Sequence, residues 1–121
     1  IEKNNRMLQK LRTVIYHTSD LTAAKSWYTS LTGKEPYFDE VFYVGFDING
    51  FELGLDPDMS KIQAGNHSTA YWSVDDIQSA VEKAVSIGAT IIDPVHNVGG
   101  TIEVAIVEDP FGNHIGFITG A

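Results

Sequence analysis

Hydrophobic and polar positions along the chain follow two patterns, and each predicts a different element. Residues 11–18 are rich in β-branched and aromatic side chains, a composition typical of a strand. Asp20 follows as a favoured helix N-cap, and Gly33 is a favoured C-terminal cap. Between these two caps the apolar side chains recur at helical spacing: Leu21, Ala24, Trp27, Tyr28 and Leu31. The first third of the chain therefore predicts a strand followed by one amphipathic helix.

Three shorter strands complete the first half of the chain. Apolar and aromatic runs at residues 37–38, 41–48 and 51–55 predict these strands. The second and third are separated by Asn49-Gly50, a dipeptide that strongly favours a tight hairpin turn. Phe42 and Tyr43 are neighbours on one predicted strand, so their side chains point to opposite faces of the sheet and one of the two faces the cleft. Asp56-Pro57-Asp58 ends this half, and a polar connector is expected at residues 61–67.

The same order of elements then restarts. Residues 68–74 predict a strand, Asp76 is a favoured N-cap, and Gly88 marks the end of a second helix. Its apolar stripe contains Ile77, Ala80, Val81, Ala84 and Ile87. Further strands are predicted at residues 90–92, 101–107 and 114–119.

This restart is an internal repeat, in which Asp20 aligns with Asp76 and Gly54 with Gly116. We expect one domain, residues 1–121, made of βαβββ modules at residues 10–58 and 67–120 and preceded by a flexible tail at residues 1–9. The extra residues of the second module are expected in a loop near residues 96–100. The predicted fold is α+β: helices cover one face of a cupped mixed sheet, and the opposite faces of the two modules line a central cleft.

The densest turn signal in the chain is Asp109-Pro110-Phe111-Gly112-Asn113. Proline sets φ for the second position of a turn, and glycine and asparagine accept positive φ. The sequence lies between two apolar runs, so it predicts a hairpin that orients the last strand.

Composition and charge exclude several classes of function. The net charge is −8, with 16 acidic and 8 basic residues, which argues against nucleic-acid binding. An acidic surface attracts cationic ligands at long range, although the same charge also serves solubility alone. There is no cysteine, so thiolate chemistry and disulfides are absent. No apolar run is long enough to cross a membrane, and a cytoplasmic location is the default expectation.

The chain resembles the vicinal oxygen chelate superfamily, which includes glyoxalase I, extradiol dioxygenases and bleomycin-resistance proteins. The resemblance covers residues 11–120 and rests on the paired βαβββ order, on the helix starts Thr18-Ser19-Asp20-Leu21 and Val74-Asp75-Asp76-Ile77, and on the turn at Asp109. It implies a glyoxalase-like fold and a homodimer whose cleft is sometimes completed by the partner.

The resemblance also implies four metal-ligand positions, which in the family's enzymes are usually histidine and glutamate. Carried over by spacing, they are Thr13, Gly54, Thr69 and Gly116. None is a histidine or a carboxylate, and divalent ions need such donors. We therefore expect no metal and no other cofactor.

Four other residues have the side-chain parity that faces the cleft: His17, Glu52, Tyr71 and His114. We expect these four to bind a ligand. The structural alternatives are a hydrogen-bonded strand histidine for His17, a solvated strand-end residue for His114 and a surface carboxylate for Glu52, while Tyr71 suits a wall of the pocket. Parallel first and last strands would separate His17 from Glu52 by roughly 20 Å, too far for one ion.

Two functions remain open from the sequence. The first is a small-molecule-binding protein with a metal-free cleft, which sequesters a cationic or aromatic compound. The alternative is a lyase, isomerase or dioxygenase of the same superfamily with a non-standard or absent metal site. The sequence assigns no catalytic residue to either function.

Overall fold

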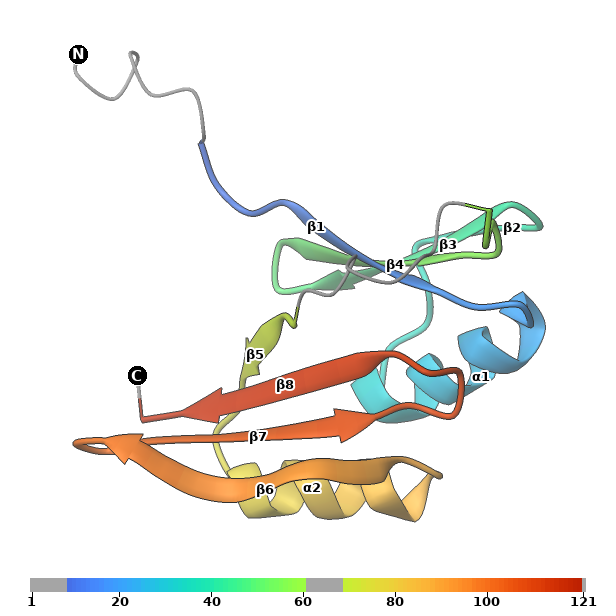
Figure 1. The fold of residues 1–121 in the computed structure, drawn as a ribbon. Coiled ribbons are helices and arrows are strands. Elements are labelled where there is room, and N and C mark those ends of the chain that lie inside the picture. Colours follow the sequence, from blue (N-terminus) through green and yellow to red (C-terminus); the bar gives the residue numbers. More distant parts are fainter. Residues whose placement is uncertain (1–8, 61–68, 121) are drawn as a thin grey trace, which may run out of the picture.

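The computed structural model describes residues 9–60 and 69–120. Of the predicted tail only Gln9 falls within these residues, and the predicted connector at residues 61–67 lies outside them. The elements follow the predicted order through two repeats (Figure 1). The first module contains β1 Thr13–His17, α1 Leu21–Thr32, β2 Phe38–Glu40, β3 Tyr43–Ile48 and β4 Phe51–Asp56. The second contains β5 Tyr71–Ser73, α2 Ile77–Ser86, β6 Thr90–Gly99, β7 Ile102–Glu108 and β8 His114–Thr119.

The capping residues act as the sequence predicted. The Asp20 carboxylate accepts a hydrogen bond from the Ala23 N–H at 3.1 Å, and Asp76 accepts one from the Ser79 N–H at the same distance. Gly33 ends α1 with φ of 71°, a conformation that glycine adopts without strain. The helices therefore begin and end at their sequence signals.

The strands form two four-stranded mixed sheets, in the orders β1-β4-β3-β2 and β5-β8-β7-β6. In each module the first strand runs parallel to the last, and the remaining pairs are antiparallel. Gly54 lies opposite Ile15, and Gly116 lies opposite Tyr71, so the two modules share one register. The α+β class, the tandem modules and the parallel pairing of the first and last strand in each module are confirmed.

The second module differs from the prediction at β6, which extends over ten residues instead of ending at residue 92. His96, which was predicted in a loop, pairs with Val104 inside this strand. The extra residues of this module therefore lengthen the β6–β7 hairpin rather than form a loop, and three register shifts interrupt its ladder. Pro94 is tolerated because β6 is an edge strand. In contrast, the strand predicted at residues 68–74 is shorter, Tyr71–Ser73.

Each helix packs on the sheet of its own module, and the apolar side chains of both modules join one core. Trp27 and Tyr28, from the predicted apolar stripe of α1, are buried there, and so is Tyr16 of β1. The Trp72 indole N–H donates to the Tyr16 hydroxyl at 3.1 Å, which links the first strands of the two modules. Neither helix in the described part of the chain has the length and apolar content of a membrane span.

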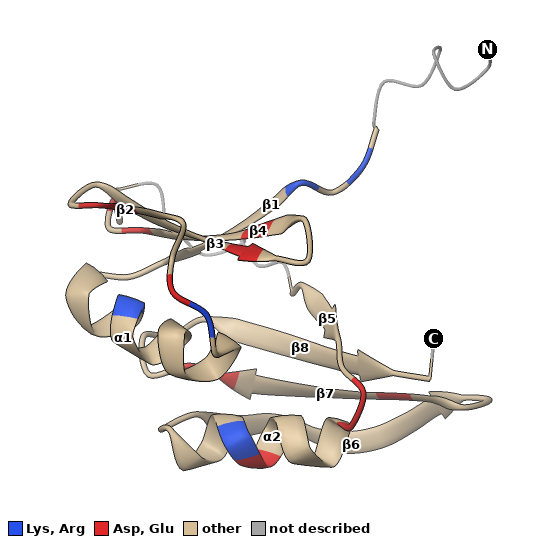
Figure 2. Ribbon diagram, turned by 180° about the vertical axis from the view of Figure 1, so that it is seen from behind, with Lys and Arg blue, Asp and Glu red and all other residues tan. Residues whose placement is uncertain are grey.

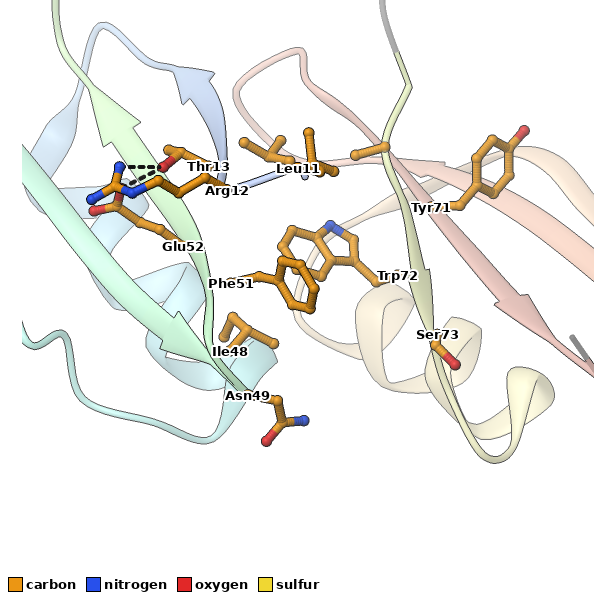
Figure 3. A pocket seen from close by; sticks show the side chains of 12 residues that line it. Leu11, Arg12, Thr13, Ile48, Asn49, Phe51, Glu52, Tyr71, Trp72 and Ser73 are labelled. Atoms are coloured by element: carbon orange, nitrogen blue, oxygen red, sulfur yellow. Dashed lines mark hydrogen bonds between the residues drawn. The ribbon is translucent and has the colours of Figure 1, made fainter. Parts of the chain in front are cut away.

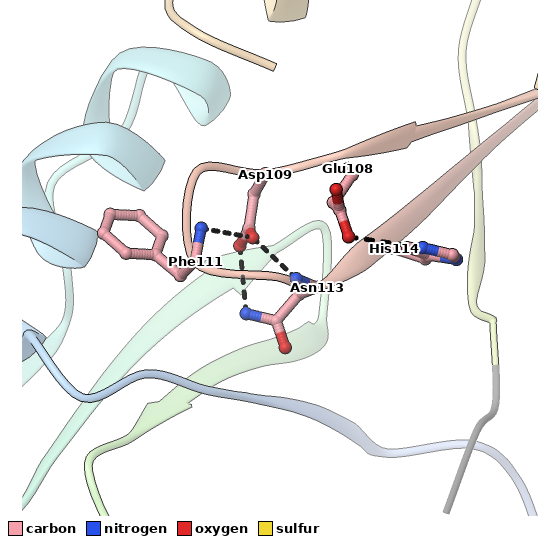
Figure 4. A network of polar contacts seen from close by, with 5 residues as sticks. All are labelled: Glu108, Asp109, Phe111, Asn113 and His114. Atoms are coloured by element: carbon pink, nitrogen blue, oxygen red, sulfur yellow. Dashed lines mark hydrogen bonds and ion pairs between the residues drawn. The ribbon is translucent and has the colours of Figure 1, made fainter. Parts of the chain in front are cut away.

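A buried carboxylate, Asp109, ties the β7–β8 turn to α1 through Tyr28. Figure 4 shows its contacts within the turn. Asp109 is almost fully buried, and its Oδ1 accepts the N–H groups of Phe111 and Asn113 at 2.9 and 2.7 Å. Its Oδ2 accepts the Tyr28 hydroxyl at 2.6 Å and the Asn113 amide at 3.0 Å. The same amide donates to the His17 carbonyl at 2.9 Å, so the predicted hairpin also fastens the second module to the first.

Tyr28→Phe is expected to lower the free energy of unfolding by about 1.5–3 kcal/mol, because it removes a hydrogen bond to a buried charge. Urea unfolding followed by circular dichroism measures this change. Tyr71→Phe is the matched control, since the Tyr71 hydroxyl makes no hydrogen bond within the described residues and its side chain is partly exposed. Equal stabilities of the two variants would contradict a structural role for the Tyr28–Asp109 contact.

Candidate functional site

The face of the first sheet that α1 does not cover carries a carboxylate held by hydroxyl groups. Glu52 on β4 lies beside Thr13 on β1, and the Thr13 hydroxyl donates to Glu52 Oε1 at 2.9 Å. The Tyr37 hydroxyl donates to Oε2 at 2.6 Å. The Tyr43 hydroxyl lies close enough to act as a third donor. Glu52 is thus fixed in position by three side chains from separate parts of the module.

These contacts keep Glu52 ionised. Burial opposes its ionisation, but the hydrogen bonds from Tyr37, Thr13 and Tyr43, together with the positive charge of Arg12, lower its pKa below 4.5. The pKa of Tyr37 is raised, first by its hydrogen bond to Glu52. Burial raises the pKa of Tyr43 to about 12, and Glu52 adds to this rise. At neutral pH the site therefore contains one carboxylate and two neutral phenols.

Two glycines make room for this arrangement. Gly45 and Gly54 lie opposite each other on β3 and β4. A Cβ atom on Gly54 would stand 1.9 Å from the Tyr43 hydroxyl oxygen, and one on Gly45 would stand 2.7 Å from Glu52 Oε2. Sequence reasoning missed Tyr37 and left Phe42 and Tyr43 undecided; Tyr43 is the one that reaches this face. Glycine in the middle of two strands was the available signal, because it marks a close approach by another group.

In the second module too, a tyrosine lies beside a glycine of the last strand. A Cβ atom on Gly116 would stand 2.6 Å from the Tyr71 ring, so this ring occupies the space beside the glycine. At both carried-over carboxylate positions, Gly54 and Gly116, an aromatic side chain of the same module fills the space. Tyr71 remains partly exposed beside β8.

The residues present do not suit a divalent metal ion. Thr13 and Thr69 offer neutral hydroxyls, the two glycines offer no side chain, and the Thr13 hydroxyl already donates to Glu52. Within residues 9–60 and 69–120, no three histidine, cysteine or acidic side chains are grouped closely enough to hold a metal. We therefore derive no chemistry that depends on a metal at these positions.

Of the four residues that the sequence singled out, Glu52 and Tyr71 both border one hollow between the modules, whereas the two histidines have other neighbours. His17 Nδ1 is 3.0 Å from the Asp58 carbonyl oxygen, and His114 Nε2 is 3.6 Å from a Glu108 carboxylate oxygen (Figure 4). Thr13 is the strand partner of Glu52, and Asp56 is that of His17. The separation of His17 from Glu52 along the strands is thus roughly 13 Å, not the 20 Å expected from the sequence, which placed Gly54 rather than Glu52 beside Thr13.

Two adjoining hollows lie next to Glu52. One has a volume of about 330 Å³ and is lined by Arg12, Tyr37, Asp47, Gly50, Phe51 and Glu52. The other, about 290 Å³, lies between the modules, and the side chains of Ile48, Phe51 and Trp72 converge in it while Tyr71 points away (Figure 3). Arg12, Phe51 and Glu52 border both hollows. A polar, acidic space therefore opens beside an apolar, aromatic one.

Tyr37→Phe is expected to raise the pKa of Glu52 toward 4.5, because it removes the strongest hydrogen bond that favours the ionised form. Because the folded-state pKa of Glu52 lies below its unfolded value, the ionised carboxylate stabilises the fold at pH values above the unfolded pKa. This stabilisation is lost as the pH falls through the folded pKa, and Tyr37→Phe is expected to reduce it. An NMR titration of the Glu52 side-chain carboxyl carbon measures the change. An unaltered titration in Tyr37→Phe would show that this phenol does not hold the carboxylate.

Comparisons with known proteins agree with the fold. A glyoxalase/bleomycin resistance protein/dioxygenase family enzyme from Burkholderia phytofirmans PsJN superposes with a TM-score of 0.78 at 18% identity, over 93% of this chain and 99% of that one. Lactoylglutathione lyase from Agrobacterium tumefaciens gives 0.75 at 17%, over 95% and 96%. TioX from Micromonospora sp. ML1 gives 0.69 at 17%, over 93% and 99%.

No curated protein sequence matched the chain. The sequence profile of one family matches residues 10–117, nearly the whole chain. The protein therefore belongs to the Glyoxalase/Bleomycin resistance protein/Dioxygenase superfamily.

Proposed function

We propose that this protein binds a small cationic, partly aromatic compound beside Glu52 and sequesters it without a metal. The observation that carries the proposal is that an acidic hollow and an apolar cleft share the lining residues Arg12, Phe51 and Glu52. A cationic group fits the acidic hollow, and an attached apolar or aromatic body fits the cleft between the modules. Small-molecule sites commonly combine an apolar wall with a few fixed polar groups in this way.

The charges around the site support a cationic ligand. The strands of the first sheet carry Asp39, Glu40, Asp47, Glu52 and Asp56 but no lysine or arginine (Figure 2). In the acidic hollow, Asp47 and Glu52 outweigh the single guanidinium of Arg12. This local excess of negative charge adds to the overall charge of −8 and favours the approach of cations.

Binding measurements by calorimetry test this proposal with benzylammonium and benzyltrimethylammonium as cationic probes. We expect at least one of them to bind more tightly than the neutral benzyl alcohol and the anionic benzoate. Glu52→Gln is expected to weaken cation binding about tenfold, as loss of a charge-assisted contact of roughly 1.4 kcal/mol would do. Glu82→Gln on α2 removes the same charge far from the site and should leave binding unchanged. Equal binding of benzyl alcohol and the cations would argue against the proposal.

Metal uptake separates this function from a metal-dependent lyase, isomerase or dioxygenase. After incubation with Ni²⁺ or Fe²⁺ and gel filtration, we expect no stoichiometric metal in the protein, because the carried-over ligand positions hold threonine and glycine. Tight one-to-one uptake would overturn the sequestration proposal and favour the enzyme.

We further propose that the protein forms a homodimer through β1 and β5. Each sheet has two edge strands, β1 and β2 in the first and β5 and β6 in the second. Two of them are poorly suited to pair with another chain, because β2 is short and acidic and β6 carries Pro94 and register shifts. The other two edge strands, β1 and β5, carry neither proline nor lysine. Each exposes a large apolar side chain, Ile15 on β1 and Tyr71 on β5. A second copy that pairs with these edges would bring the open faces of two modules together around one site.

Ile15→Lys is expected to shift the dimer toward the monomer, because a charge on an exposed strand edge opposes pairing. Ile15 is 45% exposed, so the lysine itself is tolerated in the single chain. Val85→Lys, at a position 43% exposed on α2, is the matched control. Sedimentation velocity over a concentration series measures the association. A wild-type protein that remains monomeric throughout would contradict the proposed dimer.

A further inference from the structure

The oxygen atoms of Glu52 have little capacity left for hydrogen bonds from a ligand. Thr13 donates to Oε1, Tyr37 donates to Oε2, and the Tyr43 hydroxyl is within reach as a third donor. An ionised carboxylate offers about four acceptor sites in all. The charge of Glu52 is therefore available to a ligand, but most of its lone pairs are not.

The behaviour of Arg12 agrees with this limit. Its side chain lies next to Glu52 and carries five N–H donors (Figure 3). Its Nη1 donates instead to the Thr13 hydroxyl at 3.3 Å, and within the described residues no ion pair joins Arg12 to Glu52. The chain's own guanidinium thus remains beside the carboxylate without forming a direct ion pair with it.

One aromatic ring borders the acidic hollow beside Glu52. Tyr37 is 62% exposed and lines this hollow together with Glu52. Phe51, the neighbour of Glu52 on β4, points toward Ile48 and Trp72 instead (Figure 3). Ring faces attract cations electrostatically and need no N–H donor from them. A cation without N–H groups also loses less hydration than a primary ammonium ion when it leaves water.

Asp47 does not change this balance. It lies across from Glu52 on β3, is exposed to solvent, and accepts the Gly50 N–H at 2.9 Å. A hydrated carboxylate at the rim attracts every cation at long range, and exposed ion pairs add little binding energy. Discrimination between classes of cation therefore rests with Glu52 and the ring of Tyr37.

Given the proposed function, on which this step rests, we propose that the site selects hydrogen-bond-poor cations, such as quaternary ammonium groups, over primary ammonium groups. The charge of Glu52 and the face of Tyr37 hold the cation. The hydroxyls on Glu52 act as specificity-determining groups, because they occupy the acceptors that a primary ammonium group would use.

The test compares benzyltrimethylammonium with benzylammonium, which share the ring and the charge. We expect the wild-type protein to bind the quaternary probe about fivefold more tightly. Tyr37→Phe keeps the ring and frees Oε2, so benzylammonium should gain affinity and the preference should fall to about one or reverse. Thr13→Val frees Oε1 and should act in the same direction. Thr90→Val, at an exposed position on β6 of the second module, is the matched control for Thr13→Val and should keep the wild-type preference.

The outcomes separate this inference from the proposed function. If neither cation binds better than benzyl alcohol, the proposed function fails, and the selectivity fails with it. If benzylammonium binds the wild-type protein as tightly as the quaternary probe, or more tightly, the function stands and the selectivity is overturned. A wild-type preference that survives in both Tyr37→Phe and Thr13→Val also overturns it, since the hydroxyls would then play no part. Circular dichroism verifies that the variants fold.

Discussion

The buried carboxylate of Asp109 is the interaction on which the arrangement of the two modules depends. A charge in an apolar core is tolerated only when it is fully hydrogen-bonded, and Asp109 receives donors from its own turn and from Tyr28 of α1. Asn113 extends the connection to the end of β1 through the His17 carbonyl. Because these partners come from both modules, the turn fixes the end of β1 relative to β8. The cleft between the modules borders Thr13 and Val14 of β1, and the hollow beside Glu52 borders Arg12, directly before this strand.

The open faces of the two sheets carry the second organising feature, which is the replacement of charged side chains by glycine. Gly54 and Gly116 stand at equivalent register positions, and the space beside them is filled by Tyr43 and Tyr71. In the first module this replacement leaves the carboxylate of Glu52 two residues away, surrounded by hydroxyl groups rather than by further ligands. A carboxylate in such surroundings attracts positive charge but does not coordinate a metal ion by itself.

The same features connect the proposed function with its selectivity. In the proposed function, the acidic strands of the first sheet would draw cations toward Glu52, and the cleft with Trp72 would offer an apolar surface for the rest of the ligand. The hydroxyls that hold Glu52 in place also reduce its capacity to accept hydrogen bonds. The same contacts that fix the carboxylate and keep it ionised would then limit which cations it holds well.

The sequence by itself determined the modules, both helices with their caps and the hairpin at Asn49-Gly50, and it showed that the four positions carried over from the family hold threonine and glycine. These follow from local rules: periodicity, capping residues, turn chemistry and the absence of donor side chains at known spacing. It misplaced the end of β6, because register shifts let a strand continue past proline and polar residues.

Only the tertiary structure decided what surrounds Glu52. The residue two positions before Gly54, rather than Gly54 itself, proved to be the partner of Thr13. Tyr37 reaches the carboxylate from outside any strand, and Tyr43 rather than Phe42 points to this face. Strand register and contacts between segments distant in sequence depend on packing across the whole sheet, which no local pattern encodes. For the same physical reason the turn at Asp109 was visible as a hairpin in the sequence, whereas its bond to Tyr28 was not.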